Sequence, residues 1–414
     1  MVPARGYNDG GLTPTVFRAV FAALITLFAA APYAGPEVRG LWVLRTSLDS
    51  PASIDRMVRS AADAGLNTLF VQVRGRGDAY YASSLEPRGF LLARQPASFD
   101  PLASVIRAAR ARGIAVHAWV NTGLVSDASM LPAAPSHVVR RHPEWLMVPK
   151  DLAGFAARTK PRDPGYAGAI ARWTRANIAT VEGLYVSPVT AEARAHAAAL
   201  ARDLARRYAL DGLHLDYVRY PHDGFDYSAA ALREFRASVA GDLTAAELSA
   251  LDARARREPA IFTDRYPQRW AAFRRDRVTA LVAGMANAAR AERPGIVISA
   301  AVVPDPAAAL DVKLQDWPGW AARGLVDALC PMAYAEERPA FTAQIDAVHR
   351  AAGGVPVWTG IGAYRLTAAE TASRIHEARR AGSAGVVLFS YDSVAAGPGR
   401  YLLTVARAAF AGTP

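Results

Sequence analysis

The stretch DGLHLDYVRYP, residues 211–221, decides the fold of this chain. Within it, Leu213 and Leu215 alternate with the polar residues His214 and Asp216. This period of two predicts a β-strand with one apolar face and one polar face. A helical pattern and the turn pair Asp-Gly precede it, which is typical of a buried parallel strand.

The end of the same stretch indicates an active site. Asp216 is followed by Arg219 and by the strand breaker Pro221. Burying an unpaired charge costs roughly several kcal/mol, so polar side chains on such a strand need partners. In α/β barrels the active site lies at the carboxyl ends of the strands, where this carboxylate and this guanidinium would stand.

Seven other apolar segments alternate with helical patterns along the chain. We expect strands at 38–44, 68–73, 114–120, 213–217, 296–303, 327–332, 355–361 and 385–390. Eight strands alternating with helices predict an α/β (β/α)8 TIM barrel as one domain over residues 36–414. We expect a long loop after the third strand and a helical insertion after the fourth. A doubly wound sheet is the alternative, but it accounts less well for polar residues at nearly every strand end.

Composition narrows the class of protein. The 414 residues are 52% hydrophobic and 21% charged, enough apolar material for a large core. The net charge of +11 is spread over 48 basic and 37 acidic residues, without the basic and aromatic clusters of nucleic-acid binders. The one cysteine, Cys330, allows no internal disulfide and lies in an apolar segment, so we interpret it as a buried hydrophobe.

Residues 1–35 have the pattern of a secretory signal. Arg5 and Arg18 precede an apolar run at 19–31, and Ala34 offers a small residue for cleavage. The alternative is an uncleaved N-terminal anchor. We therefore expect a periplasmic or secreted protein, membrane-anchored if the segment is retained, with no other transmembrane segment.

Asp216 is the first candidate for catalysis. Two carboxyl groups that face one scissile bond can act together, one donating a proton and the other acting as nucleophile or base. We expect Arg219 to lower the pKa of Asp216 and keep it ionised, as a nucleophile or a stabiliser of positive charge. Glu336 is the preferred proton donor, with Asp305 and Asp392 as competitors. The alternative for Asp216 is a structural pair with Arg219.

Other polar and aromatic residues near strand ends are candidates for binding the hydroxyls, carboxylates and apolar faces of a substrate. Each has a structural alternative, either a buried hydrogen-bond network or core packing. These candidates are Gln72, Arg74, Asp78, Tyr80, Asn121, His214, Arg219, Tyr334, Trp358 and Tyr391. Trp42 and Trp119 also lie near strand ends. We predict no catalytic metal and no cofactor, because the motifs for metal, dinucleotide and phosphate sites are missing from the sequence.

Several long segments resemble the glycosyl-hydrolase-like family ten, a group of exported bacterial TIM-barrel proteins. They are EVRGLWV, TLFVQVRGRGDAYYAS, AVHAWVN, HPEW, DGLHLDYVRYP, QDWPGWAARGLVDALCPMAY and GVVLFSYDS. The resemblance implies action on polysaccharides, and for some members on peptidoglycan glycan strands, including strands stripped of peptides. Many relatives carry two adjacent acids after the fourth strand, whereas here Asp216 precedes Tyr217. A carbohydrate-binding barrel without catalysis is therefore the alternative function.

Overall fold

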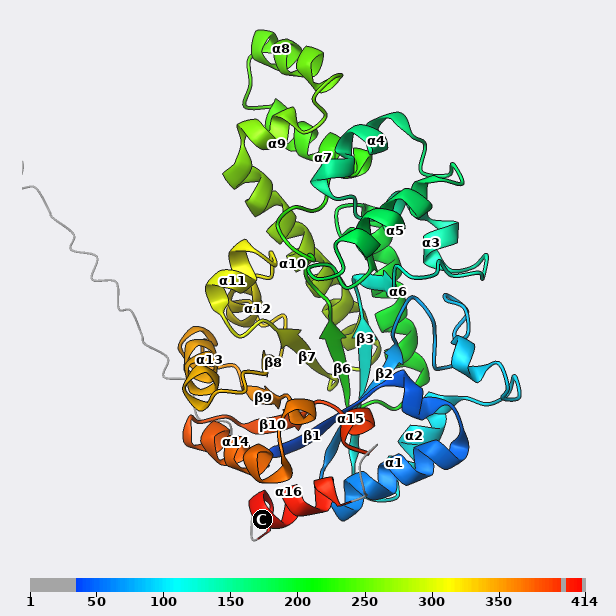
Figure 1. The fold of residues 1–414 in the computed structure, drawn as a ribbon, viewed down its shortest axis with the longest axis vertical. Helices are drawn as coiled ribbons and strands as arrows, with labels where there is room; N and C mark the ends of the chain where they lie inside the picture. Colours follow the sequence, from blue (N-terminus) through cyan, green and yellow to red (C-terminus); the bar gives the residue numbers. More distant parts are fainter. Residues whose placement is uncertain (1–34, 396–399, 412–414) are drawn as a thin grey trace, which may run out of the picture.

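Eight parallel strands form a closed barrel in the computed structural model, which describes residues 35–395 and 400–411 (Figure 1). Their order around the barrel is β1, β10, β9, β8, β7, β6, β3, β2. The barrel closes where β1 pairs with β10, and Val38 stands opposite Gly385. The strands are β1 Val38–Val43, β2 Thr68–Arg74, β3 Ala115–Asn121, β6 Gly212–Asp216, β7 Val297–Val302, β8 Ala328–Ala333, β9 Trp358–Ile361 and β10 Gly385–Leu388.

This closure confirms the predicted TIM barrel and excludes the doubly wound sheet, because no barrel strand has a free edge. All eight predicted strands lie within a few residues of their observed positions. The predicted signal segment falls almost wholly on residues 1–34, outside the described part of the chain. No helix in the described ranges is both long enough and apolar enough to cross a bilayer.

Helices surround the barrel and follow the strands (Figure 1). Local sequence sets their ends: Ser50 and Asp100 cap the first turns of α1 and α2 through their side chains. Gly65 and Gly113 follow these two helices with φ near +65°, a conformation that favours glycine. The outer helices are α1 Pro51–Asp63, α2 Pro101–Arg110, α6 Ala191–Arg207, α10 Pro267–Glu292, α12 Trp317–Ala322, α13 Arg338–Ala351, α14 Ala368–Arg380 and α16 Tyr401–Ala409.

The segment between β3 and β6 is folded rather than a plain loop. A two-stranded antiparallel sheet, β4 Leu124–Ser126 with β5 Leu184–Tyr185, lies beside α3 Val138–Arg141, α4 Ala153–Arg158 and α5 Tyr166–Ala176. These elements share a separate apolar cluster that includes Trp145 and Tyr166. We call this segment, residues 122–190, the β3–α6 excursion.

The predicted helical insertion follows β6. It comprises α7 Ala229–Ala240, α8 Ala245–Ala255 and α9 Ile261–Arg265, and it packs on the start of α10 through Phe235 and Trp270. Figure 1 shows these helices projecting beyond the barrel. Two further short helices, α11 Pro306–Asp311 and α15 Tyr391–Ala395, follow β7 and β10.

Aromatic side chains fill the interior of the barrel. Trp42, Phe70, Trp119 and Trp358 form one buried cluster with Cys330, which confirms that the cysteine packs as a small hydrophobe. The clustered rings form a rigid floor beneath the carboxyl ends of the strands.

Candidate active site

A pocket of about 320 Å³ opens at the carboxyl ends of the barrel strands. It holds one carboxyl group, three guanidinium groups and several aromatic rings. Its lining residues are Trp42, Leu44, Arg45, Gln72, Arg76, Trp119, Asn121, Asp216, Tyr217, Arg219, Ala301, Met332, Tyr334 and Phe389. The structure thus brings together five of the predicted site residues, Gln72, Asn121, Asp216, Arg219 and Tyr334.

Asp216 is the last residue of β6, and two donors fix its carboxyl group. The indole Nε1 of Trp119 donates to Oδ2 at 3.1 Å, and the backbone N–H of Tyr217 donates to Oδ1 at 2.6 Å. Tyr217 has φ of 53°, an uncommon value for a residue with a side chain. The loop after β3 approaches closely here, since a Cβ on Gly123 would lie 2.7 Å from the Tyr217 carbonyl oxygen. This glycine and the turn at Tyr217 together aim Asp216 into the pocket.

Arg219 pairs with a residue that sequence reasoning missed. Its Nη2 lies 2.8 Å from Oε1 of Glu182 in the β3–α6 excursion, and the Tyr185 hydroxyl donates to the other carboxylate oxygen at 2.7 Å. The guanidinium also lies over the Tyr217 ring, 4.8 Å from its centroid. Arg219 is therefore held by Glu182 and Tyr217, and among the described residues its ion pair is not with Asp216.

This arrangement corrects the expected ionisation of Asp216. Burial raises the pKa of Asp216 to about 6, and the nearby Arg219 charge and the two hydrogen bonds only partly offset that effect. The prediction of a lowered pKa is wrong because desolvation outweighs the charge of Arg219, which forms its ion pair with Glu182. The pKa of Glu182 falls to about 2 despite partial burial, chiefly through Arg219. A carboxyl with a pKa near 6 suits proton donation better than nucleophilic attack.

The rest of the pocket lining is cationic and polar. Arg45 donates from Nη1 to Oε1 of Gln72 at 3.0 Å, and Gln72 in turn bonds Asn121 at 3.4 Å. The Nε atoms of Arg45 and Arg219 are buried without a hydrogen-bond partner. Arg76 forms no ion pair with any described residue. The pocket therefore gathers three guanidinium groups around Asp216, an arrangement suited to an anionic or hydroxyl-rich ligand.

Six of the ten predicted binding residues lie outside this lining, and the first three are His214, Trp358 and Tyr391. His214 is fully buried below Asp216; its Nε2 accepts from Trp42 Nε1 at 3.1 Å, so its Nδ1 donates to Ser299 Oγ at 2.9 Å. Burial lowers its pKa and keeps it neutral. Trp358 is 4% exposed within the barrel cluster. Tyr391 lines a different hollow beside α1 and α16. Alternation along a strand fixes the face of a side chain but not its depth in the barrel.

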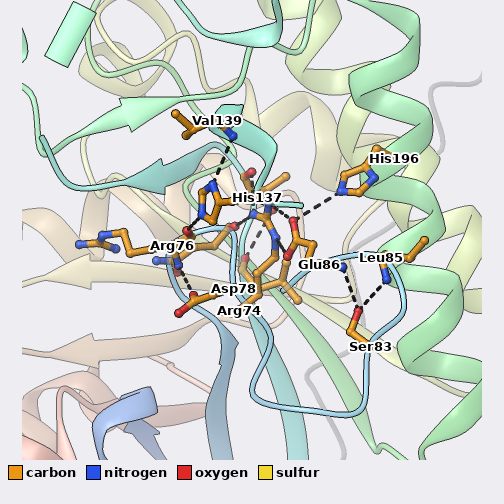
Figure 2. Close-up of polar contacts among 12 residues, drawn as sticks. Arg74, Arg76, Asp78, Ser83, Leu85, Glu86, His137, Val139 and His196 are labelled. Carbon is orange, nitrogen blue, oxygen red and sulfur yellow. Dashed lines mark hydrogen bonds and ion pairs between the residues drawn. The ribbon is translucent and has the colours of Figure 1, made fainter. Parts of the chain in front are cut away.

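The predicted residues at and after the end of β2 make buried contacts beside the pocket, and Figure 2 shows Arg74 and Asp78 among these contacts. Arg74 makes two bonds to Glu86, Nε to Oε2 at 2.7 Å and Nη2 to Oε1 at 2.6 Å, and also donates to the backbone carbonyls of Asn121 and Thr122. The Asp78 carboxylate accepts the Arg76 N–H at 2.9 Å and closes a turn.

Tyr80 is fully buried in the core. The network therefore supports the pocket from outside: Arg74 holds the end of β3 that carries Asn121, and Asp78 shapes the turn that carries Arg76. These three predicted residues therefore lie beside the pocket rather than in its lining.

The three acids considered as partners of Asp216 lie outside the pocket lining. Glu336 has a side chain 60% exposed and an ion pair with Arg365 at 3.3 Å. Asp305 caps α11 through the backbone N–H groups of its first turn. Asp392 accepts from Leu44 N and from the hydroxyls of Thr46 and Ser47. Asp216 is thus the one carboxyl group among the described residues that line the pocket.

The structure also adds residues to the site. Arg45, Trp42, Trp119 and Tyr217 stood at or near predicted strand ends, but Arg76 and Glu182 carried no such signal. Glu182 lies more than thirty residues before Arg219, in a segment without strong hydrophobic periodicity. Its pairing depends on how the β3–α6 excursion folds back over the barrel.

The closed barrel and its pocket define a TIM-barrel protein of the glycoside hydrolase type, with a carboxyl among aromatic and guanidinium groups at the strand ends. The model of the family described as Glycosyl hydrolase-like 10 matches residues 37–372, and the chain belongs to this family. The resemblance predicted from the sequence motifs is therefore confirmed.

Curated relatives and solved structures agree with this class. The chain is 22% identical over 213 residues to glycosyl hydrolase YngK of Bacillus subtilis, covering 47% of this chain and 36% of YngK. It is 26% identical over 155 residues to glycosyl hydrolase DigH of Escherichia coli K12, covering 30% of this chain and 35% of DigH. The matches thus span about a third of these relatives.

Two solved structures show the same fold. The glycoside hydrolase domain of PgaB (BpsB) from Bordetella bronchiseptica has a TM-score of 0.58 at 16% identity, over 89% of this chain and 98% of that domain. The GH42 β-galactosidase Gan42B from G. stearothermophilus also has a TM-score of 0.58, at 15% identity, over 91% of this chain and 56% of the enzyme.

Proposed function

We propose that this protein is an exported glycoside hydrolase that cleaves an acidic glycan, peptidoglycan glycan strands stripped of their peptides being the first choice. The observation that carries the proposal is Asp216, a carboxyl with a pKa of about 6 that lies in an open pocket and is held by Trp119 and Tyr217. The family membership and the signal-like segment at residues 1–35 support hydrolysis and export.

In the proposed mechanism Asp216 is the general acid. It donates its proton to the glycosidic oxygen as the bond from that oxygen to the anomeric carbon breaks. The carboxylate that remains is stabilised by the Trp119 and Tyr217 N–H groups and by the Arg219 charge. The pocket lining offers no second carboxyl group among the described residues. Attack on the anomeric carbon therefore falls to a water molecule or to a group of the substrate itself.

The charge of the pocket supports an acidic substrate. Arg45, Arg76 and Arg219 surround a site where positive charge develops on the sugar ring in the transition state. Carboxylates on the substrate would offset that repulsion and bind the guanidinium groups through paired hydrogen bonds. Removing the peptide from peptidoglycan leaves a free lactyl carboxylate on alternate sugars, whereas intact strands have that group in amide linkage.

The direct test compares the wild-type protein with Asp216→Asn on both substrates. We expect the wild type to release soluble fragments from stripped strands faster than from intact peptidoglycan, as measured by mass spectrometry. Loss of a general acid lowers the rate by about 10²- to 10⁴-fold, so Asp216→Asn should release almost nothing. Equal release by both proteins would remove Asp216 from the mechanism.

Glu336→Gln in the same assay decides the role of the predicted second acid. A two-carboxylate mechanism through Glu336 requires a loss comparable with that of Asp216→Asn. The exposed position of Glu336, paired with Arg365, instead predicts activity within about twofold of the wild type.

The single carboxyl in the pocket favours one second candidate, a carbohydrate-binding barrel without catalysis. That function predicts binding of stripped strands by the wild type and by Asp216→Asn alike, with no fragment released by either protein.

A further inference from the structure

A second hollow of about 620 Å³ lies beside the active-site pocket. We call it the α5 groove, because the carboxyl end of α5 forms one of its walls. The other walls are the segment between α5 and β5, the loop after β6, and the segment after α11. The residues used below are Trp173, Ile178, Glu182, Val312 and Lys313, all of which line it.

The α5 groove and the active-site pocket share one wall. Arg219 lines the pocket and Glu182 lines the groove, and the two side chains are joined by the 2.8 Å ion pair. The backbone N–H of Tyr220 also donates to the Lys313 carbonyl at 2.9 Å, which ties the groove to the segment that follows Asp216. The Arg219–Glu182 pair thus stands between the pocket and the groove.

The groove displays apolar surface that the fold itself does not use. Ile178 is 60% exposed and Val312 is 42% exposed. They are two of the five large apolar residues with such exposure in the described ranges, and both line this groove. Scattered exposed apolar residues are ordinary on a protein surface, but two that meet in one concave site indicate a ligand.

An indole and an ammonium group complete the surface. The Trp173 Nε1 donates to Asp151 at 3.1 Å, and its ring packs edge-on against Phe225 at 5.6 Å, so its orientation is fixed. Flat indole and aliphatic surfaces suit the apolar faces of sugar rings. Lys313 donates to the Pro221 carbonyl but forms no ion pair with any described carboxylate, so its charge remains available.

We propose that the α5 groove binds the continuation of the same acidic glycan strand whose scissile bond lies in the active-site pocket. This inference rests on the proposed function and extends it from single-bond cleavage to recognition of a long polymer. Ile178, Val312 and Trp173 contact sugar faces, and Lys313 meets a carboxylate of the strand. The Arg219–Glu182 pair lies under the strand between the two sites.

The test uses the full chain carrying Ile178→Ser and Val312→Ser together. Both side chains are exposed, so the double variant should fold normally, which circular dichroism checks. A control carries Phe90→Ser and Met130→Ser, which replace exposed apolar residues outside the groove, at 71% and 80% exposure. The substrates are stripped peptidoglycan strands, used either as long strands or as the shortest fragments that the wild type cleaves.

We expect the ratio of kcat/KM on long strands to kcat/KM on short fragments to fall about tenfold in the groove variant, since apolar contact with the distant sugars is lost. The control variant should keep the wild-type ratio. A ratio that is the same in the groove variant and the control would overturn the inference.

Failure of the proposed function gives a different pattern. In that case the wild type releases no fragment from any strand, and binding of long strands is measured by isothermal titration calorimetry. Weaker binding by the groove variant than by the control then supports the groove without the hydrolase. Equal binding by the two, or no binding by the wild type, overturns the groove as a glycan site.

Discussion

Two sites in this barrel place an arginine near an acid, and they differ in nearly every consequence. In the first, Arg74 and Glu86 are joined by two hydrogen bonds, and both side chains are almost fully buried. In the second, Asp216 and Arg219 lie three residues apart at the end of β6, but Arg219 pairs with Glu182. The first site is closed and the second faces a pocket.

The ionisation of the two acids shows what the difference means. Both are strongly desolvated, and desolvation alone raises a carboxyl pKa. For Glu86 the facing guanidinium and the nearby His196 overcome that effect, and the pKa falls to about 2 (Figure 2). For Asp216 the hydrogen-bond donors are neutral N–H groups and Arg219 forms its ion pair with Glu182, so desolvation outweighs their effect and the pKa rises to about 6. Both acids are buried, so the difference between their pKa values comes from whether a guanidinium group faces the carboxyl group directly.

The largest expected effect comes from breaking the closed site. Glu86→Gln leaves the Arg74 charge buried without a counter-charge, so we expect the free energy of unfolding at pH 7 to fall by about 3–5 kcal/mol. Urea denaturation followed by circular dichroism measures it. Because the pKa of Glu86 is lowered in the folded state, its stabilisation is present above about pH 4.5 and is lost as pH falls through about 2.

The matched control for that change is Glu258→Gln. Glu258 pairs with Arg254 at 2.8 Å, but both side chains are more than half exposed. Exposed pairs contribute about 0–1 kcal/mol, so this variant should be close to the wild type in stability. Equal losses for Glu86→Gln and Glu258→Gln would contradict the view of the first site as a closed structural pair.

At Asp216 the pH dependence of stability should have the opposite sign to that at Glu86. The folded-state pKa of Asp216 is raised, so its favourable contribution is complete below about pH 3.8 and is lost as pH rises through 6. Between pH 4 and pH 7 the wild type should lose about 2 kcal/mol of stability relative to Asp216→Asn. The amide also disturbs the hydrogen bond from Trp119, but it does so at every pH. Only the part of the stability difference that changes with pH therefore reports the ionisation of Asp216.

A stability difference between wild type and Asp216→Asn that does not change from pH 4 to pH 7 would show that Asp216 is ionised throughout, like Glu86. The contrast between the two sites would then disappear.

The smallest expected effect comes from changing the Glu182–Arg219 ion pair, which lies near Asp216. Glu182→Gln removes a negative charge and releases Arg219, so the pKa of Asp216 should fall and the alkaline limb of kcat/KM should move to lower pH. Arg219→Gln removes the positive charge and should move that limb to higher pH. We expect shifts of about half a pH unit in opposite directions. Shifts of the same sign would show that the Glu182–Arg219 pair does not control Asp216.

The fold was predictable because its signals are local. Each barrel strand is a short apolar run bounded by turns, and helices such as α1 repeat their buried residues at helical spacing. The folded β3–α6 excursion was predicted only as a long loop. Its small sheet has strands of two and three residues, too short to give a periodic pattern.

The candidate site was only partly predictable. Asp216, Gln72 and Asn121 end barrel strands, and the ends of parallel strands meet at one rim. Arg74 and His214 satisfy the same sequence rule but are buried outside the pocket lining, Arg74 against Glu86 and His214 deeper along β6 against Trp42. The Glu182–Arg219 contact joins two loops without a sequence motif, so the ionisation of Asp216 required the three-dimensional structure.

The ionisation of Asp216 is the central claim, and carbon-13 NMR of the aspartate carboxyl groups measures it directly. The protein would be labelled at these carbons and titrated from pH 3 to pH 8, with the resonance assigned by its loss in Asp216→Asn. We predict a pKa of about 6 for this carboxyl group. A value below 4 would mean that Arg219 or another cation keeps Asp216 ionised, and it would contradict its role as the proton donor.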